Sequence, residues 1–330
     1  MKIKKILIRL LDKKIVPFKI IKLLIKLAGW KNSITINLFH PKFSLEEIET
    51  IKKWDLESIK TLHKKFKPPM KCKYDFDSLK NRVFFRYHDL ISVGIKLKGK
   101  KILDLGAGTG ESLIFAKNFG IAKATGLDYS AKKFNNFIKN NQRLINPSNL
   151  EIINYVEADA SKQIFKNNSF DLIVTNSSFE HFENPTSVLK NMWQMCKSDG
   201  YIHIRFRPLF YSPRGAHRYG YTGIPYIQNL YSNHVVYEFF YNFLKIPHRN
   251  NRYTGEKISP TDVYPEMNKW KCKQFEEHFT KNNDWQVIKY EKIYEKSFKW
   301  FVKIFPERFS QFSDEDLFIC GLNVVLKCKK

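Results

Sequence analysis

The residues most suited to chemistry form a glycine-rich turn, Leu103-Asp104-Leu105-Gly106-Ala107-Gly108-Thr109-Gly110-Glu111. Gly106 and Gly108 allow a sharp turn and a close approach of the backbone to a ligand. The helix expected after them offers free N–H groups. The spacing is GxGxG rather than the GxGxxG of dinucleotide sites. Asp104 and Glu111 flank a turn without Lys or Arg, so a ligand with positive sulfonium and ammonium groups suits it better than a pyrophosphate.

Two further acidic residues end the next two predicted strands. Asp128, in Gly126-Leu127-Asp128-Tyr129-Ser130, lies about twenty residues beyond the turn, where a carboxylate accepts hydrogen bonds from ribose hydroxyls. Asp159, in Glu157-Ala158-Asp159-Ala160, is placed to accept the exocyclic amine of adenine. One acidic residue at a strand end is common in loops. Three at successive strand ends after this turn indicate a site for a nucleoside-containing cofactor.

Alternating strands and helices must position these residues. Strands are predicted at 102–105, 124–128, 151–156, 170–175 and 201–206, with helices at 111–118, 131–144 and 186–196. The alternation predicts an α/β fold, a Rossmann-like and mostly parallel sheet with helices on both faces. Two later strands, 285–290 and 317–326, flank an aromatic, basic helix at 297–305.

The chain is expected to divide into four parts. These are a basic helical extension (1–75), the cofactor-binding core (76–206), an aromatic cap insertion (207–284) and the last strands of the sheet (285–330). Helices at 46–65 and 78–95 are predicted to lead to the first strand.

Residues 100–206 resemble the core of class I S-adenosylmethionine-dependent methyltransferases, in particular the broad group called type 11. The resemblance is carried by LDLGAGTGE, GLDYS, the strand 170–174 with the loop FEHFENP after it, and KSDGYI. It implies a seven-stranded sheet whose last strand is antiparallel, with Asn176 close to the cofactor. The expected cofactor-binding residues are Asp104, Gly106, Ala107, Gly108, Gly110, Asp128, Tyr129, Asp159, Ala160 and Asn176.

Two histidines are candidates for a catalytic base. A hydroxyl acceptor benefits from a general base, and His181 follows the fourth strand, on the edge of the sheet where ligands bind. His217 lies in the loop after the fifth strand, and Glu180 is a weaker candidate. Alternatively, His181 orders its loop through a hydrogen bond and His217 is an ordinary surface residue.

An arginine and aromatic cluster after the fifth strand suggests the acceptor. The expected substrate-binding residues are Arg205, Arg207, Arg214 and Tyr211. Arginine favours bidentate contact with phosphate or carboxylate, and aromatic faces stack on sugars. The stretch SPRGAH also resembles a loop in methyltransferases of bacterial surface-polysaccharide biosynthesis. These features favour O-methylation of a glycan, lipid-linked or phosphorylated small acceptor, unless the stretch is simply the aromatic core of the cap.

The alternatives are RNA methylation, methylation of a free lipid or quinone, and a non-catalytic cofactor-binding partner subunit. Composition keeps the first of these open, since 57 Lys and Arg against 32 Asp and Glu give a net charge of +25. Such a charge suits nucleic acid, an anionic membrane or a phosphorylated substrate, and a lysine-rich coding bias explains it equally well. The loop after the fourth strand lacks the Pro-Pro motif of amino-nitrogen methyltransferases, and no RNA-binding module is apparent, so nucleic acid is disfavoured.

Residues 1–30 combine basic side chains with apolar residues at helical spacing. Pro17 divides them into two short amphipathic helices. These helices either contact an anionic membrane peripherally or pack on the protein itself. Lysines interrupt every apolar run, which argues against a membrane-spanning helix or a signal peptide.

Cysteine and histidine spacing bears on metals and on the compartment. The five cysteines form no CxxC pair, and the nine histidines show no HExxH-like spacing. This pattern predicts no metal site and a reduced, cytoplasmic protein, either free or on the inner face of the membrane.

Overall fold

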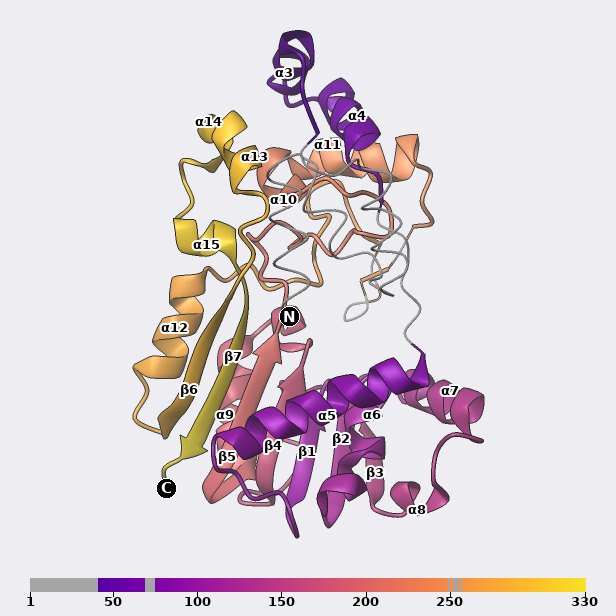
Figure 1. The fold of residues 1–330 in the computed structure, drawn as a ribbon, viewed down its shortest axis with the longest axis vertical. Helices are drawn as coiled ribbons and strands as arrows, with labels where there is room; N and C mark the ends of the chain where they lie inside the picture. Colours follow the sequence, from indigo (N-terminus) through magenta and orange to yellow (C-terminus); the bar gives the residue numbers. More distant parts are fainter. Residues whose placement is uncertain (1–40, 69–74, 249, 252–254, 256) are drawn as a thin grey trace, which may run out of the picture.

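A computed structural model describes residues 41–68, 75–248, 250–251, 255 and 257–330. Residues 1–40 lie outside the described part, and so does the predicted membrane-contacting segment within them. A seven-stranded sheet forms the lower half of the molecule, and short helices and loops form a separate upper lobe (Figure 1).

The sheet has the strand order β3-β2-β1-β4-β5-β7-β6. Its strands are β1 (Lys101–Leu105), β2 (Lys123–Asp128), β3 (Ile153–Glu157), β4 (Phe170–Asn176), β5 (Cys196–Phe206), β6 (Trp285–Tyr294) and β7 (Ile319–Cys328). The first five run parallel, whereas β7 is antiparallel to both β5 and β6. The predicted Rossmann-like fold with an antiparallel last strand is therefore confirmed.

Helices cover both faces of the sheet. They are α5 (Phe76–Ser92), α6 (Glu111–Ile114), the 3₁₀ turn η2 (Ala116–Phe119), α7 (Lys132–Asn141), α8 (Pro147–Leu150), α9 (Pro185–Met195) and α12 (Cys272–Thr280). Side chains alternate between the faces along each strand. Ile102 of β1 accordingly packs in one apolar cluster with Val83 and Leu90 of α5. Its neighbour Leu103 packs in another, with Met192 of α9 and Phe275 of α12.

The upper lobe has its own apolar core. Its elements are α3 (Leu45–Ile51), α4 (Leu56–Lys65), α10 (Ile227–Leu230), α11 (Asn233–Tyr237), the π-helix η4 (Glu238–Phe243), α13 (Lys299–Ile304), α14 (Pro306–Phe309) and α15 (Asp314–Phe318). Ile59 of α4 is buried there with Tyr226, Phe240 and Phe301. Three stretches far apart in sequence thus share one core, which accounts for much of the aromatic content after β5.

The single helix predicted at 46–65 is in fact two. Trp54 takes a left-handed conformation with φ 55°, and the Asp55 side chain caps α4 by accepting the Ser58 N–H at 2.9 Å. An N-cap residue has non-helical backbone angles, so α3 ends at Ile51 and α4 begins after Asp55.

Two further properties concern the cysteines and the lengths of the helices. Among the described cysteines, Cys196, Cys272, Cys320 and Cys328 are free thiols. Within the described ranges, no helix is both long and apolar enough to cross a bilayer.

Candidate active site

A cavity of about 870 Å³ opens at the carboxyl ends of β1, β2 and β4. This edge is where α/β sheets bind ligands. Its walls are Arg82, Arg86, Asp104, Gly106, Ala107, Gly108, Thr109, Glu111, Ser112, Leu127, Asp128, Tyr129, Ser130, Lys132, Lys133, Asn136, Ala158, Ala160, Asn176, Ser177, Ser178, His181 and Phe182. Most of the residues expected to bind the cofactor are therefore brought together.

The glycine turn forms the floor between β1 and α6. The N–H groups of Gly106 and Ala107 donate to the Leu127 carbonyl at 2.8 and 3.1 Å, which joins the turn to β2. Gly106 has φ 72°, and a Cβ there would collide with the Ser178 side chain. Gly110 has φ 69° immediately before α6. Only glycine adopts such angles without strain, so the spacing GxGxG follows from this turn.

Asp104 lies at the back of the cavity, with 3% of its surface exposed. Within the described part of the chain, its Oδ1 has no hydrogen-bond partner. Burial raises the pKa of the carboxyl to about 7, Arg86 lowers it, and Glu111 and Asp128 raise it. A buried carboxylate oxygen without a partner is costly, so Asp104 is suited to a cationic ligand group.

Asp128 and Asn176 complete the polar wall. Asp128 Oδ2 accepts the Gly108 N–H at 2.9 Å, and this hydrogen bond connects the end of β2 to the glycine turn. Asn176 ends β4, and its buried Oδ1 has no partner among the described residues.

Asp159 lies beside the cavity rather than in its wall. Ala158 and Ala160 on either side of it do line the cavity. Asp159 Oδ1 accepts the Tyr129 hydroxyl at 3.0 Å and the Ser161 N–H at 2.8 Å. The first of these contacts fixes the hydroxyl of Tyr129, which lines the cavity. The contact of Asp159 with adenine stays a prediction.

Sequence reasoning missed two arginines of α5. Arg82 and Arg86 both pair with Glu111, the latter at 3.4 Å. Both line the cavity, and the positive charge of Arg86 lowers the pKa of Asp104. Their i, i+4 spacing places them on one helix face, but only the packing of α5 over the glycine turn brings that face to the site.

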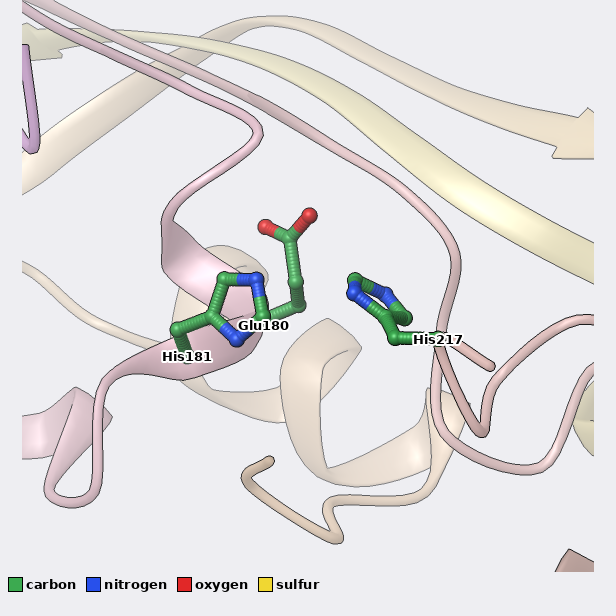
Figure 2. Close-up of side chains that lie close together, drawn as sticks. All are labelled: Glu180, His181 and His217. Carbon is green, nitrogen blue, oxygen red and sulfur yellow. The ribbon is translucent and has the colours of Figure 1, made fainter. Parts of the chain in front are cut away.

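Three titratable side chains gather beside this cavity. Glu180 and His181 belong to the 3₁₀ turn η3 (Phe179–His181) after β4, and His217 lies in the loop after β5. Figure 2 shows the three side chains converging, and their ligand-type atoms lie within 4.8 Å of one another. The rings of His181 and His217 are perpendicular, with centroids 4.9 Å apart.

Glu180 is the buried member of this trio, with 2% exposure. Burial raises the pKa of its carboxyl to about 8, although the backbone N–H groups of Glu180 and Arg207 lower it. Its Oε2 has no partner among the described residues. His181 is oriented by a 2.9 Å hydrogen bond between its Nδ1 and the Glu266 carbonyl.

The structure separates the arginines predicted to bind substrate. Arg205 stacks on Phe85 of α5, 5.2 Å from the ring centroid, near the cofactor cavity. Arg207 and Arg214 both lower the pKa of Tyr219, whose ring centroid lies 6.1 Å from that of His217.

Tyr211, the aromatic residue predicted to bind substrate, is half-buried. Its ring lies 5.2 Å from that of Phe312, at the edge of the upper-lobe core.

Residues 103–204 match the model of the methyltransferase domain family. An uncharacterized protein of Haemophilus influenzae is 30% identical over 111 residues, which cover 34% of this chain and 43% of that protein. The match thus spans less than half of the relative's length. An S-adenosylmethionine dependent methyltransferase from Mesorhizobium loti is similar in structure, with a TM-score of 0.44 and 16% identity over 76% of this chain and 99% of that chain. These partial likenesses do not bear on the acceptor.

Residues 103–204 match a methyltransferase domain, and the strand order and the acidic glycine turn agree with a domain of the class I type. Domains of this type use S-adenosylmethionine as their cofactor.

The residues of the cavity fit that cofactor. The partnerless oxygens of Asp104 and Asn176 offer acceptors for its ammonium and other N–H groups. Asp128 offers a carboxylate for ribose hydroxyls, and Arg82 and Arg86 offer positive charge for its carboxylate.

The raised pKa of Asp104 makes cofactor binding depend on pH. The carboxyl is charged above about pH 7 and neutral below it, and only the carboxylate attracts an ammonium group. We expect the affinity for S-adenosylmethionine to fall roughly 20-fold between about pH 7.5 and 5.5. Asp104→Asn should bind weakly at both pH values. Calorimetric titration measures the affinity for S-adenosylmethionine at both pH values. Equal affinity of the wild-type protein at the two pH values would contradict the role of Asp104.

Proposed function

We propose that the protein is an S-adenosylmethionine-dependent O-methyltransferase that acts on a glycan, lipid-linked or phosphorylated small acceptor. The observation that carries the proposal is the adjacency of two sites. His181 lines the cofactor cavity and also belongs to the trio with Glu180 and His217. The methyl-donor site and the group of side chains that can accept a proton therefore have His181 in common.

When bound, S-adenosylmethionine supplies an electrophilic methyl group on a sulfonium. The chain's own part is to hold donor and acceptor in line and to exclude water. Asp104, Asp128 and Asn176 hold the donor in the cavity. The trio faces the acceptor, whose hydroxyl must give up its proton, and His181 and His217 are the proposed bases.

Positive and aromatic groups beside the trio favour an acceptor that carries negative charge. Arg214 stacks on Tyr219, 5.9 Å from the ring centroid, and Tyr219 donates its hydroxyl to the Arg214 carbonyl at 2.6 Å. Arg207 is exposed and precedes the same loop. Arginine recognises phosphate and an aromatic face recognises a sugar ring, which together suit a phosphorylated or lipid-phosphate-linked glycan.

A second candidate acceptor is RNA, which the net charge of +25 favours. A third reading is a non-catalytic subunit that binds the cofactor in support of a partner enzyme. An RNA methyltransferase and a non-catalytic subunit can each be distinguished from the proposed glycan methyltransferase by following the transferred methyl group directly.

Transfer of labelled methyl into fractionated extract of the source cells tests the proposal. The fractions are nucleotide sugars, lipid-linked glycans, other lipids, RNA and protein, and a cofactor-site variant, Asp128→Ala, is the control. We expect label in a glycan-containing fraction with the wild-type chain only. Label in RNA would overturn the acceptor class. No label despite cofactor binding would favour the partner-subunit reading.

A further inference from the structure

The trio of Glu180, His181 and His217 has the composition of a metal centre. Two imidazoles and one carboxylate from three positions resemble catalytic zinc sites, in which a fourth coordination position stays open. The candidate ligand atoms lie within 4.8 Å of one another. Bonds of about 2.0–2.2 Å to each ligand require them within about 4 Å, so small side-chain adjustments close the site.

The surroundings of Glu180 point independently to a cation. The side chain is 2% exposed, and its Oε2 has no partner within the described residues. In Figure 2 the Glu180 side chain lies between the two imidazole rings. A buried carboxylate is retained when it is paired or coordinates a metal.

The hydrogen bond of His181 has the form expected of a metal ligand. Its Nδ1 lies 2.9 Å from the Glu266 carbonyl, an acceptor, so Nδ1 carries the proton and donates. That tautomer leaves the lone pair on Nε2, which Figure 2 shows directed towards the other two side chains. Metal-bound histidines almost always donate their second ring N–H in this way, often to a backbone carbonyl.

We propose that Glu180, His181 and His217 bind one divalent transition-metal ion of the zinc type. Two imidazole ligands favour zinc, copper, iron or nickel over magnesium and calcium, which prefer oxygen. The residue spacing, from which no metal site was predicted, does not indicate this centre, because Glu180 and His181 are adjacent rather than on one helix face and His217 comes from a distant loop.

The metal's role, unlike its binding, rests on the proposed methyl transfer, and with the metal bound His181 and His217 act as ligands instead of bases. His181 lines the cofactor cavity, so the open coordination position borders the acceptor side of that cavity. An acceptor hydroxyl bound there has a lowered pKa. Its O–H bond breaks, the proton leaves to solvent, and the electron pair stays on the oxygen bound to the metal. The acceptor class is then an alcohol whose neighbouring oxygen or phosphate reaches Arg207 or Arg214.

Metal titration of the purified full-length chain tests the binding. The chain is stripped with a chelator and titrated with Zn²⁺ by calorimetry and with Co²⁺ by visible absorption. We expect one ion per chain, a Co²⁺ spectrum typical of nitrogen and oxygen ligands, and no comparable binding of Mg²⁺. Glu180→Gln and His217→Ala should each weaken Zn²⁺ binding by at least about tenfold, as loss of even an outer partner can do.

The matched control is His234→Ala, which removes an exposed histidine of α11 and should bind Zn²⁺ as the wild type does. Retained affinity for S-adenosylhomocysteine shows that each variant is folded. Absence of stoichiometric metal from a folded wild-type chain, preference for Mg²⁺, or wild-type Zn²⁺ binding by both trio variants would overturn the proposal. The assay involves no turnover, so failure of the proposed methyl transfer leaves its result unaffected.

Discussion

Replacement of Asp128 by alanine should nearly abolish cofactor binding without unfolding the protein. The carboxylate accepts the Gly108 N–H at 2.9 Å and faces the cavity at the end of β2, where ribose hydroxyls are bound in this fold. A hydrogen bond to a charged group contributes about 1.5–3 kcal/mol, and each 1.4 kcal/mol is about tenfold in affinity. We therefore expect S-adenosylmethionine to bind roughly 10- to 100-fold more weakly, or below detection, in calorimetric titration.

The control for this variant is Glu151→Ala. Glu151 is exposed and pairs with Lys117 at 3.3 Å, a surface contact of small energetic value. It should bind the cofactor as the wild type does. Wild-type affinity for S-adenosylmethionine in Asp128→Ala would contradict the proposed contact with ribose. Loss of the cooperative thermal unfolding transition in this variant would mean that the carboxylate chiefly stabilises the glycine turn.

The second large effect is expected on turnover. At least one of the variants His181→Ala and His217→Ala should lower the rate of methyl transfer to the labelled acceptor fraction by about 10²-fold or more, the usual contribution of a proton acceptor. His217 does not line the cofactor cavity, so its removal should leave the affinity for S-adenosylmethionine unchanged. Single-turnover rates at saturating cofactor measure the effect.

The pair of variants separates the two ways in which the trio can act. A single catalytic base predicts a large loss in one variant only, whereas a shared metal ion predicts a loss in both, together with loss of bound Zn²⁺. A fall of less than tenfold in both variants would mean that alignment of donor and acceptor alone drives transfer.

The cofactor half of the site was predictable because its signals are local. Gly106 and Gly110 have positive φ values that a strand-to-helix turn of this shape requires. Asp104 and Asp128 end strands that the apolar runs of the sequence already mark. Parallel strands bring their carboxyl ends to one edge, so residues of this kind could be placed together from order and spacing alone.

The rest of the site depends on tertiary packing. Arg86 reaches the cavity because α5 crosses the sheet over the glycine turn, and no local pattern encodes that crossing. His217 was identified from the sequence as an isolated candidate, but its position beside Glu180 depends on how the loop after β5 folds back, with Gly215 packed against the backbone of Phe210.

The upper lobe is the clearest case of information spread along the chain. Ile59, Tyr226 and Phe301 share one core, although each lies in a different stretch of the sequence. The aromatic residues after β5 suggested a substrate surface, and many of them serve this core instead. Tyr226, for example, is fully buried and donates its hydroxyl to the Leu317 carbonyl at 3.0 Å.

Direct binding of S-adenosylmethionine by the purified chain tests the central claim. Calorimetric titration should give one molecule bound per chain, with S-adenosylhomocysteine competing for the same site and NAD failing to displace either. That result is predicted because acidic strand ends flank the glycine turn and suit a cationic ligand rather than a pyrophosphate. Binding of NAD in place of S-adenosylmethionine, or no binding of either by a folded chain, would contradict the account.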